Sequence, residues 1–159
     1  MSVIPGHILA EFIKVLSNKQ IQPAGVDLTV REIYCFQSTG AIKKKETLLP
    51  SYLKVKDISG VFKLLKGAYL VRFNEIVEVP EDCIGIFLPR SSLLRIGATM
   101  CSALWDPGYK GRGVGLLLVH NEHGIEIEVN SRIAQMIFIR MEKKPNRTYS
   151  GKYQHEGLE

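Results

Sequence analysis

The chain begins with apolar residues at the spacing of a helix. Between positions 7 and 16 they recur three and four residues apart, at Ile8, Leu9, Phe12, Ile13 and Leu16. In a helix these positions share one face. The polar run 17–19 then ends the pattern. The sequence therefore predicts one amphipathic helix over residues 7–16.

Beyond residue 26 the pattern changes to the alternation and short apolar runs of β-strands. Residues 69–73 and 125–129 alternate in the manner of half-buried strands. Glycine, proline and asparagine separate further strand-like runs, over 27–36, 75–79, 83–88, 114–120 and 132–141. Many short strands with turn residues between them predict an all-β (mainly β) fold, either a barrel or two packed sheets.

Residues 1–159 are expected to form a single domain. A mass of 17.9 kDa with 45% hydrophobic residues suffices for one core. No linker or internal repeat divides the chain. Residues 143–159 lose all periodicity while keeping polar, aromatic and glycine residues, which predicts a flexible C-terminal arm.

The charge balance favours an anionic partner. The chain has 21 Lys and Arg against 16 Asp and Glu, a net charge of +5. Nucleic acids and nucleotide phosphates both fit such a charge. Few aromatic residues lie among the lysines of the second quarter, so we expect no stable nucleic-acid partner. The apolar runs are shorter than the ~18 residues of a membrane-spanning helix, and we expect a soluble, cytoplasmic protein.

One segment has the composition of a phosphate site. Arg90, Ser91, Ser92 and Arg95 follow an apolar strand-like run within six positions. Arginine binds phosphate oxygens bidentately, and serine hydroxyls complete the oxygen shell. A helix N-cap at one of the serines, with a surface arginine, explains the same residues.

Two aspartates lie in apolar surroundings. Asp106 stands between an apolar stretch and the turn residues Pro107 and Gly108, which predicts a carboxylate at a strand end with limited solvent access. Such a group suits a general base for a water molecule, although the spacing alone favours an aspartate that merely shapes the turn. Asp27 could hold Mg²⁺ through water, or anchor a turn.

The sequence motifs for zinc-dependent deamination and for dinucleotide binding are both incomplete. His120 and Glu122 match half of a zinc deaminase motif, but no paired cysteines follow to complete the ligand set. The glycine run 111–115 precedes a strand-like segment, whereas a dinucleotide-binding loop needs a helix after it.

Five ordered segments together resemble the motif set of the dUTPase and dCTP deaminase superfamily. They span nearly the whole chain, at 21–28, 89–95, 105–111, 132–135 and 149–154. The chain is most similar to the archaeal-type dUTPases, which are built on a dCTP deaminase-like scaffold. This resemblance implies a distorted jelly-roll β-barrel with a short N-terminal helix, a homotrimer with active sites between subunits, and a deoxynucleoside triphosphate bound with Mg²⁺.

The resemblance also implies residue roles. Asp106 would orient the attacking water, and Asp27 would support the metal and water network. Tyr109 would pack on the deoxyribose, and the arm from Tyr149 to Gln154 would close over the substrate. The substrate-binding residues implied in this way are Arg90, Ser91, Ser92, Arg95, Tyr109, Lys110, Arg132, Gln135, Tyr149, Lys152, Tyr153 and Gln154.

The choice of reaction depends on one strand. Deamination of dCTP needs a glutamate after the third segment, and counting from Asp106 places Leu116 there. Ala134 in the fourth segment also resembles the dUTPase form. We therefore expect hydrolysis of dUTP to dUMP and pyrophosphate. The third and fifth segments are deaminase-like, which leaves dCTP deamination, alone or coupled to hydrolysis, as an alternative. A non-catalytic regulatory or nucleic-acid-binding protein is a further alternative.

Overall fold

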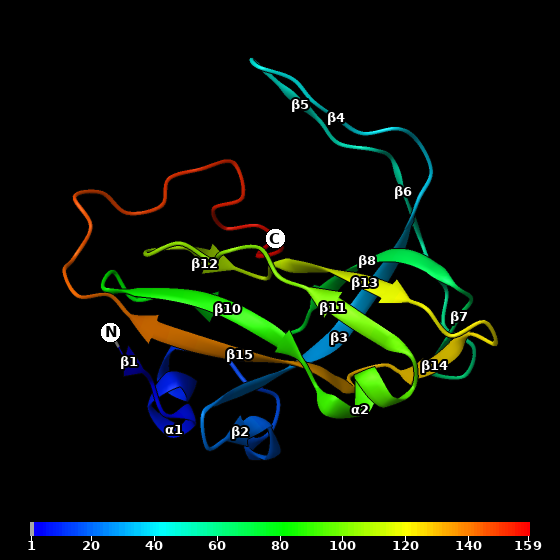
Figure 1. Ribbon diagram of the computed structural model, residues 1–159, viewed down its shortest axis with the longest axis horizontal. Coiled ribbons are helices and arrows are strands. Elements are labelled where there is room, and N and C mark those ends of the chain that lie inside the picture. The colour runs from blue at the N-terminus through cyan, green and yellow to red at the C-terminus, as the bar shows by residue number, and fades with distance from the viewer. Residues whose placement is uncertain (1) are drawn as a thin grey trace.

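Strands make up most of the secondary structure, as the pattern predicts. The computed structural model describes residues 2–159 and is shown in Figure 1. The strands are β1 (Ser2–Val3), β2 (Ile21–Gln22), β3 (Gly25–Phe36), β4 (Ala41–Ile42), β5 (Thr47–Leu48), β6 (Tyr52–Lys54), β7 (Val61–Leu64), β8 (Gly67–Phe73), β9 (Val77–Glu78), β10 (Cys83–Pro89), β11 (Ala98–Cys101), β12 (Lys110–Gly111), β13 (Val114–Val119), β14 (Ile125–Glu128) and β15 (Arg132–Arg140). The helices are α1 (Gly6–Leu9) and α2 (Ser91–Arg95), with 3₁₀ turns η1 (Ala10–Phe12) and η2 (Asn18–Gln20).

One antiparallel sheet curls back on itself. Its strands follow the order β1, β15, β3, β8, β13, β11, and β10 pairs with the same β15. Beyond β11 the chain returns to β10, where Gly85 and Trp105 exchange two backbone hydrogen bonds of 2.8 Å. The amide of Phe87 also donates to the Ser102 hydroxyl at 3.2 Å. These contacts join the two ends of the sheet around a single core.

Strand β3 connects the two halves of the sheet. Its first half pairs with β15 through Val26 to Thr29, and its second half pairs with β8 from Val30 onward. Both pairings shift register, β15 between Arg132 and Ala134 and β3 after Val30. Such irregularities bend a strand, so they let β3 turn from one neighbour to the other.

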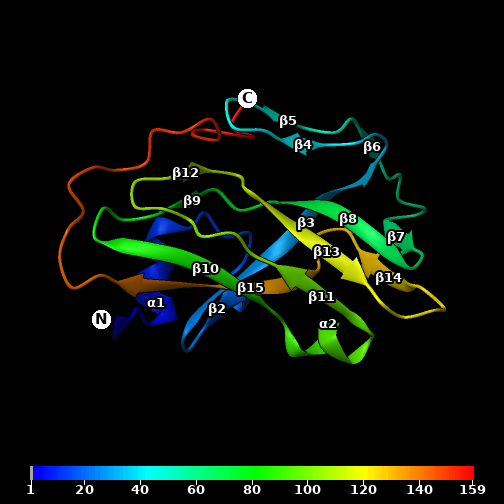
Figure 2. The ribbon, with the colours of Figure 1, turned by 45° about the horizontal axis from the view of Figure 1, so that its top comes forward.

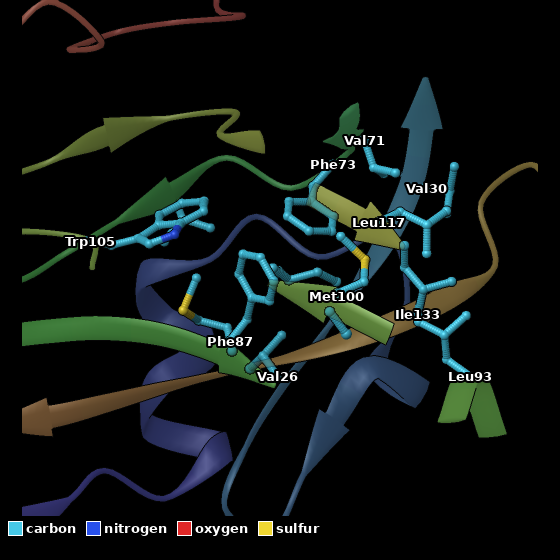
Figure 3. Close-up of a cluster of buried hydrophobic side chains, with 14 of the residues drawn as sticks. Val26, Val30, Val71, Phe73, Phe87, Leu93, Met100, Trp105, Leu117 and Ile133 are labelled. Carbon is cyan, nitrogen blue, oxygen red and sulfur yellow. The ribbon is translucent and has the colours of Figure 1, made fainter. Parts of the chain in front are cut away.

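The core follows the strand alternation. Strand β13 alternates half-buried and buried residues along its length. Figure 3 shows aromatic and aliphatic side chains meeting inside the sheet. Phe73 and Phe87 pack edge to face at 5.2 Å, and Phe87 reaches Trp105 at 6.4 Å. Gly115 has to lack a side chain here, because a Cβ would lie 2.6 Å from both Met100 and Phe87.

The N-terminal helix is shorter than predicted. Helix α1 and the turn η1 end at Phe12, and Ile13 is already extended, with φ −130° and ψ 119°. Ile13 pairs with Val77, and the Lys14 amide donates to the Ile76 carbonyl at 2.9 Å. Leu16 therefore lies outside the helix despite its helical spacing, because the pairing with the strand region at Val77 ends the helix early.

The predicted strands are present, with elements the pattern did not show. Only Val77–Glu78 forms a strand within 75–79, whereas the other predicted strands agree closely with the structure. The unpredicted elements are β1, β2, β4 to β7, β11, β12, α2 and the turn η2. Strands β4 and β5 form a hairpin that projects from the sheet (Figures 1 and 2). No helix among residues 2–159 is long and apolar enough to cross a membrane.

A fully buried glutamate ties three segments together. Glu75 accepts hydrogen bonds from the Thr29 amide at 2.9 Å, the Thr29 hydroxyl at 2.6 Å and Gln20 Nε2 at 2.7 Å. Gln20 Nε2 also donates to the Asp27 carbonyl at 2.8 Å. Burial raises the pKa of the Glu75 carboxyl, and the hydrogen bonds from Thr29 oppose this. The network holds η2 and β3 in place.

We predict that Glu75→Gln destabilises the fold. An amide offers one acceptor where three donors converge, so the Thr29 amide or Gln20 Nε2 would face another donor. An unsatisfied buried donor costs about 1–3 kcal/mol of the free energy of unfolding. Chemical denaturation would measure the loss, with Glu126→Gln as the control, since Glu126 pairs with Lys63 on the surface. Equal stability of the two variants would contradict the prediction.

Candidate functional site

An aromatic cleft of about 400 Å³ contains four of the predicted site residues. Asp106, Tyr109, Tyr149 and Tyr153 all line it. Its other lining residues are Leu49, Tyr52, Leu70, Arg72, Ala103, Leu104, Trp105, Gly113, Val114 and Glu156. Strands β6, β8 and β13, the loops after β5 and β11, and the C-terminal segment contribute these residues. The cleft has the size and the mostly apolar lining of a small-molecule site.

Asp106 lies at the start of a tight turn. The Tyr109 amide donates to the Asp106 carbonyl at 3.1 Å, and Gly108 has a φ of +82°. In this four-residue turn Pro107 occupies the second position and Gly108, with its positive φ, the third, which is typical of a type II turn. Trp105 and Pro107 are buried, whereas Asp106 is exposed. The predicted limited solvent access of Asp106 is therefore wrong for the single chain, because the turn directs its neighbours inward and leaves this carboxylate at the surface.

Tyr109 is buried and held on three sides. Its ring packs edge to face against Trp105 at 5.0 Å and Tyr149 at 5.8 Å. Its hydroxyl donates to Glu156 Oε1 at 2.9 Å. Burial, together with the neighbouring Glu156 carboxylate, raises the pKa of the Tyr109 phenol well above its usual range. Tyr109 therefore presents a neutral, fixed ring to the cleft.

The C-terminal segment, residues 143–159, lies against the domain and forms one wall of the cleft. Gln154 accepts from the Lys110 amide and donates to the Gly108 carbonyl, both at 2.9 Å. The Tyr149 amide donates to the Pro107 carbonyl at 2.7 Å. Lys152 is exposed, with its ammonium 5.8 Å from the Tyr153 ring centroid. Lys110 pairs with Glu78 at 2.7 Å, outside the cleft lining.

A second cluster gathers around the buried carboxylate of Asp27. Asp27 Oδ2 lies 3.3 Å from Arg90 Nε and 3.2 Å from Arg132 Nη1, and Gln22 Nε2 donates to it at 3.2 Å. Burial raises the pKa of the Asp27 carboxyl, while Arg90 and Arg132 oppose this. Asp27 thus fixes two guanidinium groups, both of them partly exposed.

Helix α2 supplies the remaining phosphate candidates. Arg90 is its N-cap residue, and Ser91 and Ser92 form its exposed first turn. Arg95 Nη1 donates to the Ser91 carbonyl at 3.1 Å. Gln135 is half-buried on β15, in register with Leu88 on β10 and with Asp27 on β3. We name the set Arg90, Ser91, Ser92, Arg95, Arg132 and Gln135 the basic cluster.

The single chain does not bring the two groups together. No member of the basic cluster, nor Asp27, lines the aromatic cleft. Helix α2 and the segment around β12 lie toward opposite ends of the molecule in both views (Figures 1 and 2). Within one chain, Asp106 and Tyr109 are therefore separated from Arg90 and its serines.

Residues 2–159 do not offer a cluster of acidic side chains that could bind magnesium directly. No group of three or more His, Cys, Asp or Glu side chains gathers among residues 2–159. Asp27 does not fit as a direct ligand, because its Oδ2 is already shared by two guanidinium groups and an amide. A metal ion would depend on oxygen ligands from outside the chain.

Two charged residues of the cleft are absent from the sequence prediction. Arg72 belongs to a strand whose alternation marks it only as an outward-facing position, and Glu156 lies in a segment without periodicity. Tyr109, in contrast, is among the predicted site residues, and it is buried. Strand β13 carries no carboxylate, and Leu116 is half-buried between Cys101 and Leu70.

Solved structures share this fold at low sequence identity. The dCTP deaminase from Agrobacterium tumefaciens matches with a TM-score of 0.65 and 18% identity, over 86% of this chain and 47% of its own. A variant of the Staphylococcus bacteriophage 80alpha dUTPase with dUpNHpp matches with a TM-score of 0.51 and 15% identity, over 87% and 95%. These likenesses confirm the predicted jelly-roll architecture.

Comparison of sequences identifies the family. A relative from Aeropyrum pernix, a probable deoxyuridine 5'-triphosphate nucleotidohydrolase, is 45% identical over 151 residues, or 95% of each chain. The deoxyuridine 5'-triphosphate nucleotidohydrolase of Methanocaldococcus jannaschii is 37% identical over 86% of this chain and 89% of its own. The model of the dCTP deaminase-like family matches residues 5–141. The chain belongs to the dCTP deaminase-like family.

Proposed function

We propose that this protein is a dUTP diphosphatase, which hydrolyses dUTP to dUMP and pyrophosphate. The observation that carries the proposal is the aromatic cleft, which combines Asp106 and Tyr109 with a strand β13 that lacks a carboxylate. The names of the relatives from Aeropyrum pernix and Methanocaldococcus jannaschii support the same reaction. Such an enzyme would act in cytoplasmic pyrimidine deoxynucleotide metabolism.

The cleft and the basic cluster would bind different parts of the substrate. The aromatic walls suit a base and a deoxyribose, with Tyr109 against the sugar. Asp106 would accept a proton from the water that opens the bond between the α- and β-phosphates. The arginines and serines of the basic cluster would hold the phosphate oxygens and the developing charge.

A homotrimer would unite the two groups. One chain separates Asp106 from the basic cluster, so a complete site needs a second copy that places its Arg90 and serines beside this cleft. Closed rings of identical subunits repeat such a heterologous contact at every interface. We propose three equivalent sites, each shared between two subunits.

We also propose that Mg²⁺ enters with the triphosphate. The described part of the chain has no cluster of carboxylates to bind the ion alone, and Mg²⁺ keeps several waters while binding phosphate oxygens. The metal would neutralise phosphate charge. Asp27 would act on it only through water, while fixing Arg90 and Arg132 directly.

Deamination of dCTP is a second candidate because of Glu156. This carboxylate reaches the cleft from the C-terminal segment rather than from β13, and burial raises its pKa. A carboxyl with a raised pKa holds its proton more readily than an ordinary carboxyl, which suits a general acid. Its Oε1 already accepts from Tyr109, however, so hydrolysis is the better supported reaction.

We predict that Asp106→Asn removes most of the hydrolytic activity. The amide cannot accept the proton of the attacking water, and loss of a general base typically lowers kcat about 10²–10⁴-fold. Pyrophosphate release from dUTP with Mg²⁺ is the measurement. Asp57→Asn is the matched control, since Asp57 is exposed in a loop outside the cleft. Unchanged turnover in Asp106→Asn would exclude this base.

We predict that two inactive variants restore each other's activity when mixed. Arg90→Gln lacks the phosphate contact and Asp106→Asn lacks the base, so each homotrimer has only defective sites. In trimers formed by co-expression, about one quarter of shared sites would combine an intact Arg90 with an intact Asp106. Turnover near that fraction is expected. A mixture as inactive as its parents, with both variants folded by thermal melting, would show that subunits do not share the site.

We predict that chelation of Mg²⁺ abolishes hydrolysis without affecting the fold. The ion binds mainly phosphate oxygens in the proposal, so EDTA should lower turnover at least ~10-fold and added Mg²⁺ should restore it. The melting temperature of the ligand-free protein should stay the same. Full turnover in EDTA would contradict a metal-assisted reaction, and a lower melting temperature would indicate a structural metal.

A further inference from the structure

Arg72 is a charged residue of the cleft to which the proposed reaction assigns no role. It lies on β8, where it is in register with Val114 on β13 and Glu32 on β3. Two strand pairings therefore fix its backbone. Leu70, two residues before it on β8, and Val114, its partner on β13, line the cleft together with Arg72.

The guanidinium of Arg72 has no partner for one of its buried donors. Among residues 2–159, Arg72 Nε is the one buried side-chain nitrogen or oxygen without a hydrogen bond. No carboxylate in that part of the chain lies within 4 Å of Arg72. Buried donors in folded proteins are nearly always satisfied, so this exception calls for an acceptor that residues 2–159 do not supply.

The nearby carboxylates are engaged elsewhere. Glu32, the cross-strand neighbour of Arg72, accepts from Lys54 Nζ and from the Tyr34 hydroxyl, both at 2.7 Å. Glu156 influences Arg72 electrostatically, but its Oε1 accepts from Tyr109 at 2.9 Å. The arrangement leaves Arg72 available to a ligand.

The surroundings of Arg72 favour a neutral carbonyl over a phosphate. The Glu156 carboxyl lines the same cleft and lies close enough to Arg72 to interact with it electrostatically, so it disfavours a phosphate at that position. The aromatic walls favour a flat ring. In the proposed shared site, the phosphate oxygens have their own ligands in the basic cluster of the second subunit.

We propose that Arg72 determines base specificity by donating to the carbonyl oxygen at position 4 of uracil. This inference rests on the proposed dUTP hydrolysis and adds the residue that recognises the base. A guanidinium has only donors. Uracil presents an acceptor at position 4, whereas cytosine presents an amino group that would face Arg72 donor to donor. A site built to hydrogen-bond one group strongly rejects an analogue that leaves its polar atoms unpaired.

Arg72→Met tests the inference through two substrates. Methionine keeps much of the stem and removes every donor. We expect kcat/KM for dUTP to fall about 10–100-fold, as for loss of a hydrogen bond to a charged group. The second substrate is the deoxynucleoside triphosphate of pyrimidin-2-one, which lacks the position-4 oxygen. Its kcat/KM should change less than about 3-fold, because the lost donor had no acceptor on it.

Control variants separate recognition from folding and from the reaction itself. Arg31→Met removes an exposed guanidinium from β3 and should leave both substrates unaffected. Arg72→Lys keeps the positive charge on a single ammonium group. Its kcat/KM should fall less than that of Arg72→Met, and the fall should still be confined to dUTP. If Arg72→Met fails to fold, the comparison of the two substrates with Arg72→Lys is the test of the inference.

Each outcome has a defined meaning. Equal losses on the two substrates, or no loss on dUTP, would overturn the role of Arg72 while leaving dUTP hydrolysis intact. Absence of pyrophosphate release from dUTP by the wild-type protein would instead overturn the proposed function. A loss confined to dUTP supports Arg72 as the residue that recognises the base.

Discussion

The double pairing of β3 is the constraint on which the rest of the structure depends. Twelve residues, Gly25–Phe36, must pair first with β15 and then with β8, and the bend between the two pairings curls the sheet. The same strand carries Asp27 in its first half and supports Arg72 of β8 through its second half. The basic cluster and the aromatic cleft are therefore fixed by one strand, although they lie far apart.

The buried carboxylates of the fold each have partners that compensate their charge. Asp27 is almost completely buried, at 1% exposure, and its carboxylate holds Arg90 and Arg132 instead of a metal ion. Removing one partner of such a group leaves an uncompensated buried charge. Glu75 is compensated by neutral donors alone. Arg72 differs from both, since its buried Nε has no partner in the described chain, and this difference distinguishes a recognition residue from a structural one.

Period-two alternation was enough to predict most of the sheet, because half-buried strands such as β13 carry that period in their sequence. The short elements β4 to β7 were missed, since strands of two to four residues show too little period. Asp106 and Tyr109 were found through their turn and family segments. Glu156 and Arg72 were not, because they enter the cleft only through tertiary contacts: the C-terminal segment folds against β12, and β8 pairs with β13.

The most direct test of the account is a product analysis of the purified protein with Mg²⁺, incubated separately with dUTP and dCTP. Pyrophosphate and ammonia would be followed independently. A cleft with a base at Asp106 and no carboxylate on β13 predicts pyrophosphate from dUTP and no ammonia from dCTP. Ammonia from dCTP would contradict it, and would show that a carboxylate such as Glu156 reaches the ring.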